Sequence, residues 1–190
     1  IGTTGNMIGD RRLKSELTTP DPIELQKTFR MMVDEGVEIV SMEVSAHAID
    51  MLRLDGVSFE VGCYTNLSQD HLDYFHTMEN YFEKFFHSGM VRNATFNADE
   101  ETTARMLEGL EIPAMTYGIC ANADLYARDI EITENGVSFN MQLAGMHNIP
   151  VNLRLTGMFN VYNAIAAASM AMILDIPAED IRAGLERVES

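Results

Sequence analysis

The chain has 190 residues, 46% of them apolar, enough for one domain whose core needs no disulfide or metal to hold it. Its 29 acidic and 13 basic residues give a net charge of -16, which argues against nucleic acid or an anionic membrane as a partner. The isolated cysteines Cys63 and Cys120, and the lack of an apolar run long enough to cross a membrane, are typical of a reduced, cytoplasmic protein.

The first two thirds of the chain alternate between helical and strand patterns. Asp21 and Pro22 are typical of a helix start, and apolar residues then recur at helical spacing until Gly36. We expect strands over 37–44, 59–64, 94–97 and 114–117, with helical segments over 47–53, 77–88 and 99–109. This order predicts an α/β fold with a doubly wound, mostly parallel sheet.

The pattern changes after residue 123. Residues 124–133, 136–145 and 148–155 alternate apolar and polar side chains, with turn chemistry at Glu134-Asn135-Gly136, and predict a small antiparallel β element. Helices are expected over 160–174 and 178–188. The chain opens on Ile1-Gly2-Thr3-Thr4-Gly5, typical of a strand that ends in a turn, and we expect the natural N-terminus to lie upstream.

Two predicted strands end in polar groups. Glu43 interrupts an apolar run, and a carboxylate there is unfavourable unless it is paired or binds a cation. His71 follows the next strand, so both groups can reach one ion, and such a pair tolerates Mg²⁺ or Mn²⁺. The alternatives are a salt bridge for Glu43 and a purely structural histidine. Asp70 and Asp73 either cap a helix or orient the imidazole.

Three further positions carry polar groups that suit a ligand. Thr18 and Thr19 precede a helix, where their hydroxyls bind a phosphate or simply cap the helix. Arg53 either binds a pyrophosphate or pairs with Asp50 or Asp55.

The start of the last long helix carries two asparagines. Asn160 and Asn163 lie three residues apart and share one helix face, where they either read an adenine edge or, for Asn160, cap the helix.

Taken in order, these segments resemble the Mur ligase family, and most closely its members that add the third residue of the peptidoglycan stem peptide. The similarity extends over residues 1–190. The strings that carry it are Thr18-Thr19-Pro20-Asp21-Pro22, Met42-Glu43-Val44-Ser45-Ala46-His47 with Arg53, Thr65-Asn66-Leu67-Ser68-Gln69-Asp70-His71-Leu72-Asp73, Asn97-Ala98-Asp99, Thr116-Tyr117-Gly118 and Gly157-Met158-Phe159-Asn160-Val161-Tyr162-Asn163-Ala164.

The resemblance implies the central ATPase domain of an ADP-forming amide ligase. Its substrates are ATP, a UDP-N-acetylmuramoyl dipeptide and an amino acid, all small molecules. By family analogy Thr18, Thr19, Ser45 and Arg53 contact the UDP-muramoyl substrate, Glu43 and His71 hold Mg²⁺, and Asn66, Asn160 and Asn163 bind the nucleotide.

The chain departs from the family pattern in three ways. The family's phosphate-binding loop and its amino-acid-binding domain fall outside these residues, so we expect the 190-residue chain alone to have no ligase activity. The family's carbamylated lysine matches Lys84 only through a shortened segment. Two rival interpretations are a folylpolyglutamate- or cyanophycin-synthetase-like ligase and a non-catalytic binding module.

Overall fold

A computed structural model describes residues 1–190 except 14, 16, 67–81, 121, 144–147 and 190. The chain forms two compact units. The first unit contains Ile1–Val57 and His76–Phe85, and the second contains Ser58–Phe75 and Phe86–Ser190. The predicted residues His71, Asp70 and Asp73 lie outside the described residues.

The first unit combines a short hairpin with two helices. In the hairpin, Asn6 pairs with Leu13 and Ile8 with Arg11, in antiparallel register. This hairpin was not predicted, because each of its strands is too short to show an alternating pattern. The elements of this unit are β1 (Asn6–Ile8), β2 (Arg11–Leu13), α1 (Pro22–Asp34) and α2 (Ala46–Asp50). Residues 82–87 are also helical, and of these 82–85 belong to this unit.

Helix α1 begins where the sequence predicts. Pro22 takes the first helical position after Asp21, although the Asp21 side chain makes no capping hydrogen bond. The helix ends before Gly36, whose φ of +76° is unfavourable for any residue with a side chain. Leu25 is fully buried and Ile23 is 72% exposed, so only part of the predicted apolar stripe is covered.

The predicted strand over 37–44 is not a strand in the structure. Ile39 and Val40 are exposed, at 65% and 40%. The segment exchanges two backbone hydrogen bonds with Ile1, whose amine donates to the Ser41 carbonyl while its own carbonyl accepts from Glu43 N–H. The prediction was wrong because an apolar run states only a preference, whereas a strand needs a partner along its length.

The second unit is built on one six-stranded sheet in the order β3-β4-β5-β6-β7-β8. The first three pairings are parallel and the last two antiparallel. The predicted antiparallel element therefore continues the parallel sheet, through Tyr117 opposite Leu125 on β5 and β6. The strands are β3 (Phe59–Tyr64), β4 (Val91–Asn97), β5 (Ala114–Gly118), β6 (Leu125–Thr133), β7 (Gly136–Leu143) and β8 (Ile149–Leu153).

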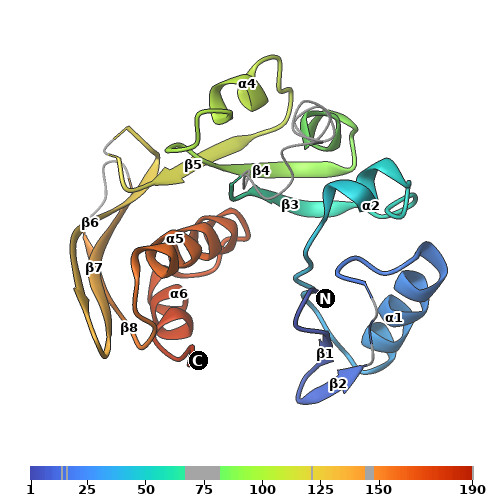
Figure 1. The fold of residues 1–190 in the computed structure, drawn as a ribbon, viewed down its shortest axis with the longest axis horizontal. Coiled ribbons are helices and arrows are strands. Elements are labelled where there is room, and N and C mark those ends of the chain that lie inside the picture. The colour runs from blue at the N-terminus through green and yellow to red at the C-terminus, as the bar shows by residue number, and fades with distance from the viewer. Residues whose placement is uncertain (14, 16, 67–81, 121, 144–147, 190) are drawn as a thin grey trace. The chain divides into compact units, whose positions relative to one another are not determined.

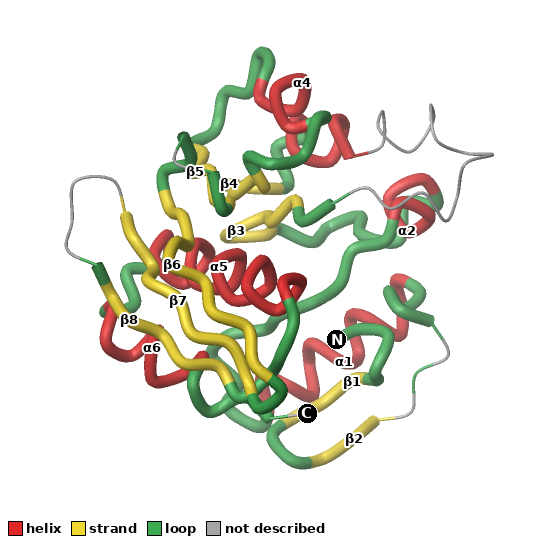
Figure 2. Tube along the Cα trace, turned by 60° about the vertical axis from the view of Figure 1, so that its left-hand side comes forward, coloured by secondary structure: helices red, strands yellow, loops and turns green. Residues whose placement is uncertain are grey.

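Helices cover both faces of this sheet. Helix α5 (Met158–Ile173) lies along one face with α6 (Ala178–Leu185), and α4 (Thr103–Leu107) lies on the opposite face (Figure 1). The β6–β8 end of the sheet curves around α5 (Figure 2). This arrangement confirms the predicted fold class. Helix α4 is shorter than the predicted range of 99–109 because residues 99–102 form turns.

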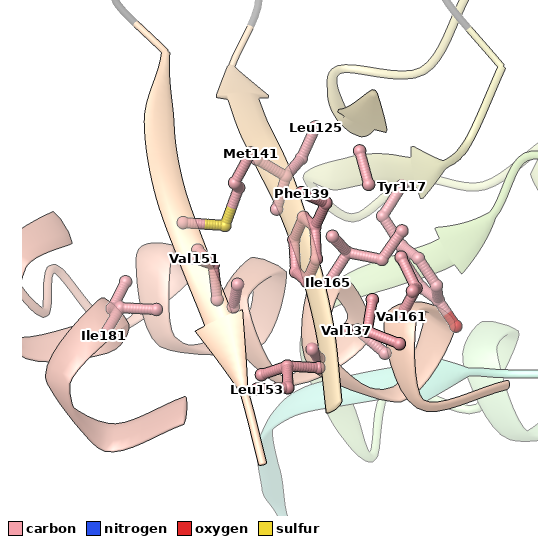
Figure 3. Packing of buried hydrophobic residues seen from close by; sticks show 14 residues of the cluster. Tyr117, Leu125, Val137, Phe139, Met141, Val151, Leu153, Val161, Ile165 and Ile181 are labelled. Carbon is pink, nitrogen blue, oxygen red and sulfur yellow. The ribbon is translucent and has the colours of Figure 1, made fainter. Parts of the chain in front are cut away.

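The main core fills the space between α5 and the sheet (Figure 3). Ile165 and Val161 on the helix are fully buried, and they meet side chains from β5 to β8. The buried members of this cluster are Tyr117, Leu125, Ala127, Val137, Phe139, Met141, Val151, Leu153, Val161, Ala164, Ile165, Ala166, Ala168 and Ile181. Among the described helices, none is both long and apolar enough to cross a bilayer.

Candidate functional site

Thr19 joins two predicted site segments of the first unit. Its hydroxyl donates to the Glu43 carbonyl at 2.9 Å and accepts from the Ser45 backbone N–H at 3.2 Å. The residue is 1% exposed. The Thr19 hydroxyl therefore both donates and accepts inside the protein, and it holds residues 18–21, which we call the threonine loop, against residues 43–45.

Arg53 also holds the threonine loop, through its guanidinium group. Its Nη1 donates to the Thr19 carbonyl at 3.1 Å, and its Nε lies 3.5 Å from an Asp21 carboxylate oxygen. The side chain is only 16% exposed. Arg53 thus pairs with neither Asp50 nor Asp55 in the structure; its oxygen partners come from the loop that precedes α1, and its Nη2 also donates to Met51 Sδ at 3.2 Å.

Ser45 occupies the N-cap position of α2. Its Oγ accepts from the Ala48 backbone N–H at 3.2 Å, which satisfies one of the otherwise unpaired donors of the first turn. An oxygen that accepts still carries its own proton, so the Ser45 hydroxyl keeps a donor for a ligand.

Glu43 has an exposed side chain whose carboxylate meets the N-terminal segment. The Thr3 hydroxyl donates to Glu43 Oε2 at 2.6 Å, and Thr3 Oγ1 lies 3.3 Å from the Thr18 hydroxyl. Thr3 was not predicted as a site residue, because nothing in its local pattern shows that it approaches a residue 40 positions away. The structure therefore adds Thr3 to the predicted cluster.

The donors around Glu43 suit a hard divalent cation. A carboxylate and hydroxyl oxygens are the ligand types that Mg²⁺ and Mn²⁺ accept, with waters completing an octahedron. Within the described ranges, no three His, Cys, Asp or Glu side chains gather into a metal-binding group. Glu43 is the described part of the predicted pair. Lys84 has an exposed side chain in the helical residues 82–87.

In the second unit, predicted nucleotide-binding residues lie at the start of α5 and after β3. Asn163 is exposed on α5, whereas the Asn160 side chain donates to the Thr156 carbonyl at 2.9 Å. The Asn160 amide thus secures the loop that enters the helix, while Asn163 presents its amide to solvent. Asn66 follows β3 with an exposed side chain.

Asp99 is a second residue to which the sequence assigned no role. Its Oδ2 accepts from the Ile119 backbone N–H at 2.7 Å and from the Tyr162 hydroxyl at 2.9 Å, and the Cys120 thiol also donates to this carboxylate. A Cβ on Gly118 would lie 2.8 Å from Oδ2, so the glycine permits the approach. Asp99 thereby ties the end of β5 to the first turn of α5. Its place after a predicted strand was the one available signal.

Hydrogen bonding governs the ionisation of this group. Burial alone would raise the pKa of Asp99, but the bonds from Cys120, Ile119 and Tyr162 outweigh it and lower that pKa. Burial, reinforced by the bond to Asp99, raises the pKa of Tyr162. Asp99 is therefore a carboxylate and Tyr162 a neutral donor at neutral pH.

Sequence comparison finds similar proteins along almost the whole chain. Residues 1–171 match the Mur ligase middle domain. A UDP-N-acetylmuramoyl-L-alanyl-D-glutamate--2,6-diaminopimelate ligase from Caldanaerobacter subterraneus subsp. tengcongensis is 39% identical over 192 residues, which cover 99% of this chain and 39% of that protein. The ligase of the same name from Bacillus licheniformis is 38% identical over 196 residues, covering 98% and 40%. The chain thus spans about two fifths of the length of these curated relatives.

Comparison of structures agrees with this assignment. A solved UDP-N-acetylmuramoyl-L-alanyl-D-glutamate--2,6-diaminopimelate ligase superposes with a TM-score of 0.90 at 26% identity, covering 100% of this chain and 40% of that one. A D-alanyl-D-alanyl-adding ligase from Acinetobacter baumannii gives a TM-score of 0.61 at 23% identity over 68% of this chain and 29% of that one. The second likeness shows the fold alone.

Proposed function

This chain belongs to the Mur ligase middle-domain family, and we propose that it is the central ATP-handling part of an ADP-forming amide ligase. The full-length protein would add the third amino acid to UDP-N-acetylmuramoyl-L-alanyl-D-glutamate in the cytoplasm. The names of the relatives favour 2,6-diaminopimelate as that amino acid. As a domain, residues 1–190 would form part of the central domain of that ligase.

The proposal rests on the hydrogen bonds that connect the threonine loop to residues 43–45. Thr19 and Arg53 hold that loop, so that Thr18 and Ser45 keep hydroxyls for the UDP-muramoyl substrate beside the Glu43 carboxylate. A ligase of this kind gains rate chiefly by placing its reactants and neutralising their charge. A prebuilt, rigidly connected site serves that purpose.

Different residues of the chain would bind the metal ion, the substrate and the nucleotide. Glu43, with His71, would hold a magnesium ion, which when bound neutralises negative charge on the transferring phosphoryl group. Thr18 and Ser45 would orient the muramoyl dipeptide so that its terminal carboxylate meets the phosphoryl group. Asn163 would hydrogen-bond the adenine from the first turns of α5, with Asn160 fixing the loop before it and Asn66 near the nucleotide. Lys84 remains a candidate for the modified lysine of the family.

A binding measurement tests the substrate side. We expect the chain to bind UDP-N-acetylmuramoyl-L-alanyl-D-glutamate in titration calorimetry and Ser45→Ala to weaken binding about three- to tenfold, the worth of one hydrogen bond. Thr4→Val changes an exposed neighbouring hydroxyl and is the matched control, with unchanged affinity. Equal affinity of wild type and Ser45→Ala would contradict the role of Ser45.

A turnover assay tests the reaction. We expect no ADP release from the 190-residue chain with ATP, the dipeptide substrate and diaminopimelate, because no Gly-Lys-Thr phosphate loop occurs in it. Measurable turnover would contradict this. Binding of a folate or cyanophycin substrate in place of the muramoyl dipeptide would favour the other ligases. Binding of the dipeptide substrate with no response to metal or ATP would favour a non-catalytic module.

A further inference from the structure

We propose that Thr3 is a positioning residue that fixes the Glu43 carboxylate and sets the direction of the hydrogen bond made by Thr18. The proposal rests on the function proposed above for the role of Glu43 toward a metal ion. It adds a residue outside the predicted site, and it states which hydroxyls of the site donate a hydrogen bond to the ligand and which accept one.

The backbone brings Thr3 beside Glu43. The Glu43 N–H donates to the Ile1 carbonyl at 3.0 Å, so the first residues of the chain run alongside residues 41–43. Thr3 Oγ1 then lies 2.6 Å from Glu43 Oε2, a short hydrogen bond to a charged acceptor. Such bonds are about twice as strong as neutral ones, so this contact decides where the carboxylate points.

Gly2 supports the same placement. A Cβ built on Gly2 would lie 2.8 Å from Glu43 Cδ, which shows that the carboxylate rests directly on the backbone at this residue. Gly2 itself is buried. The carboxylate is thus held on one side by a hydroxyl and on the other by a surface that only glycine provides.

The proton count sets the direction of the Thr18 contact. A threonine hydroxyl has one proton, and Thr3 gives its proton to Glu43. At 3.3 Å the Thr18 hydroxyl must therefore donate to Thr3. Thr18 then faces a ligand with its lone pairs only, as an acceptor.

Ser45 has the opposite polarity. Its oxygen accepts from Ala48 N–H, which leaves its own proton for a ligand acceptor. The site would therefore favour a ligand that offers an oxygen acceptor to Ser45 and an N–H or O–H donor to Thr18. An amide-bearing substrate such as a muramoyl peptide meets both requirements, whereas a phosphodiester group has no N–H or O–H to offer Thr18.

Two substitutions at Thr3 separate positioning from packing. Thr3→Val keeps the shape of the side chain and removes the hydroxyl, whereas Thr3→Ser keeps the hydroxyl and removes the methyl group. If Thr3 acts through its hydrogen bond, serine preserves function and valine does not. If it acts through packing, the order reverses.

The first measurement is the affinity for Mn²⁺ alone, from the signal of free Mn²⁺ in electron paramagnetic resonance. We expect Thr3→Val to weaken binding about tenfold, as is typical when the partner of a metal ligand is removed, and Thr3→Ser to stay within about twofold of wild type. Thr4→Val is the control. If Glu43→Gln loses affinity for Mn²⁺ but Thr3→Val keeps the wild-type affinity, the proposal is overturned.

The second measurement needs no metal. Three-bond NMR couplings along the Glu43 side chain should report one rotamer in wild type and Thr3→Ser, and averaging in Thr3→Val. Averaging in all three proteins would overturn the proposal even if Mn²⁺ binds. Conversely, if Glu43→Gln binds Mn²⁺ like wild type while the couplings behave as expected, the metal role of Glu43 fails and the positioning by Thr3 stands.

Discussion

Asp99 shows how much one carboxylate can organise. Donors from two segments converge on it: Ile119 and Cys120 after β5, and the Tyr162 hydroxyl on α5. Because Tyr162 lies between Asn160 and Asn163 on α5, the same bond sets the position of the proposed adenine contacts relative to β5.

Replacing this carboxylate should make stability depend less on pH. The pKa of Asp99 is lowered below its ordinary value of 3.8, so its contribution is complete above that value and is lost as pH falls through the lowered one. We expect Asp99→Asn to lose about 1–2 kcal/mol of unfolding free energy at pH 7, a value discounted for partial exposure, and the difference from wild type to shrink below about pH 4.

Urea unfolding at several pH values measures this difference. Glu101→Gln removes an exposed carboxylate two residues away and serves as the control, for which we expect no such change between pH 7 and pH 3. A constant gap between Asp99→Asn and wild type over that range would show that the charge of Asp99 does not matter.

For single residues, the sequence predicted which ones belong to the site better than it predicted their contacts. Resemblance selected Thr19 and Arg53, and both lie in one cluster of the first unit. Their partners were not predictable. The Thr19 hydroxyl bonds to the backbone 24 and 26 positions away. Arg53 pairs with Asp21 and not with acids closer in sequence. Such pairs depend on the tertiary fold, which the local sequence does not show.

At the scale of elements, α5 is attached to the sheet by a buried hydrogen bond as well as by apolar packing. The Thr95 hydroxyl on β4 donates to Ser169 Oγ at 2.9 Å, and Ser169 donates in turn to the Ala166 carbonyl of its own helix at 2.8 Å. Both side chains are fully buried. Removing Ser169 alone therefore leaves the Thr95 donor without a partner in the core.

A double-mutant cycle tests this contact. We expect Ser169→Ala to lower the unfolding free energy by about 1–3 kcal/mol, because a buried donor is left unsatisfied. Adding Thr95→Val removes that donor, so the double variant should lose less than the sum of the two single losses. Unfolding in urea gives all three values. Strict additivity would mean that the two hydroxyls do not depend on each other.

The elements also show where patterns suffice and where they fail. Strand β3 matches its predicted range of 59–64, and the β6–β7 hairpin turns where Asn135-Gly136 predicts. Both signals are local: an apolar run between breakers, and turn chemistry. The segment 37–44 has an equally apolar run, but pairing depends on a neighbouring strand, and Ile1 offers this segment only two backbone hydrogen bonds, to Ser41 and Glu43.

At the scale of the whole molecule, the two units differ in how well their apolar groups are buried. The large core cluster belongs entirely to the second unit. The first unit keeps several large apolar side chains exposed, namely Ile23, Val33, Ile39, Val40, Met51 and Leu52. Since burial of apolar surface supplies most of the folding free energy, local stability should differ between the units.

Hydrogen exchange should reveal this difference residue by residue. Amides of β4, β5 and β7 lie on interior strands of the six-stranded sheet, so their exchange should require global unfolding and be slowest. Amides of residues 37–42 lie in an exposed segment outside any described strand or helix and should exchange fastest, apart from chain ends. Measurement at two pH values separates opening from intrinsic chemistry. Equal protection in both groups would mean that the first unit draws stability from contacts beyond its own buried side chains.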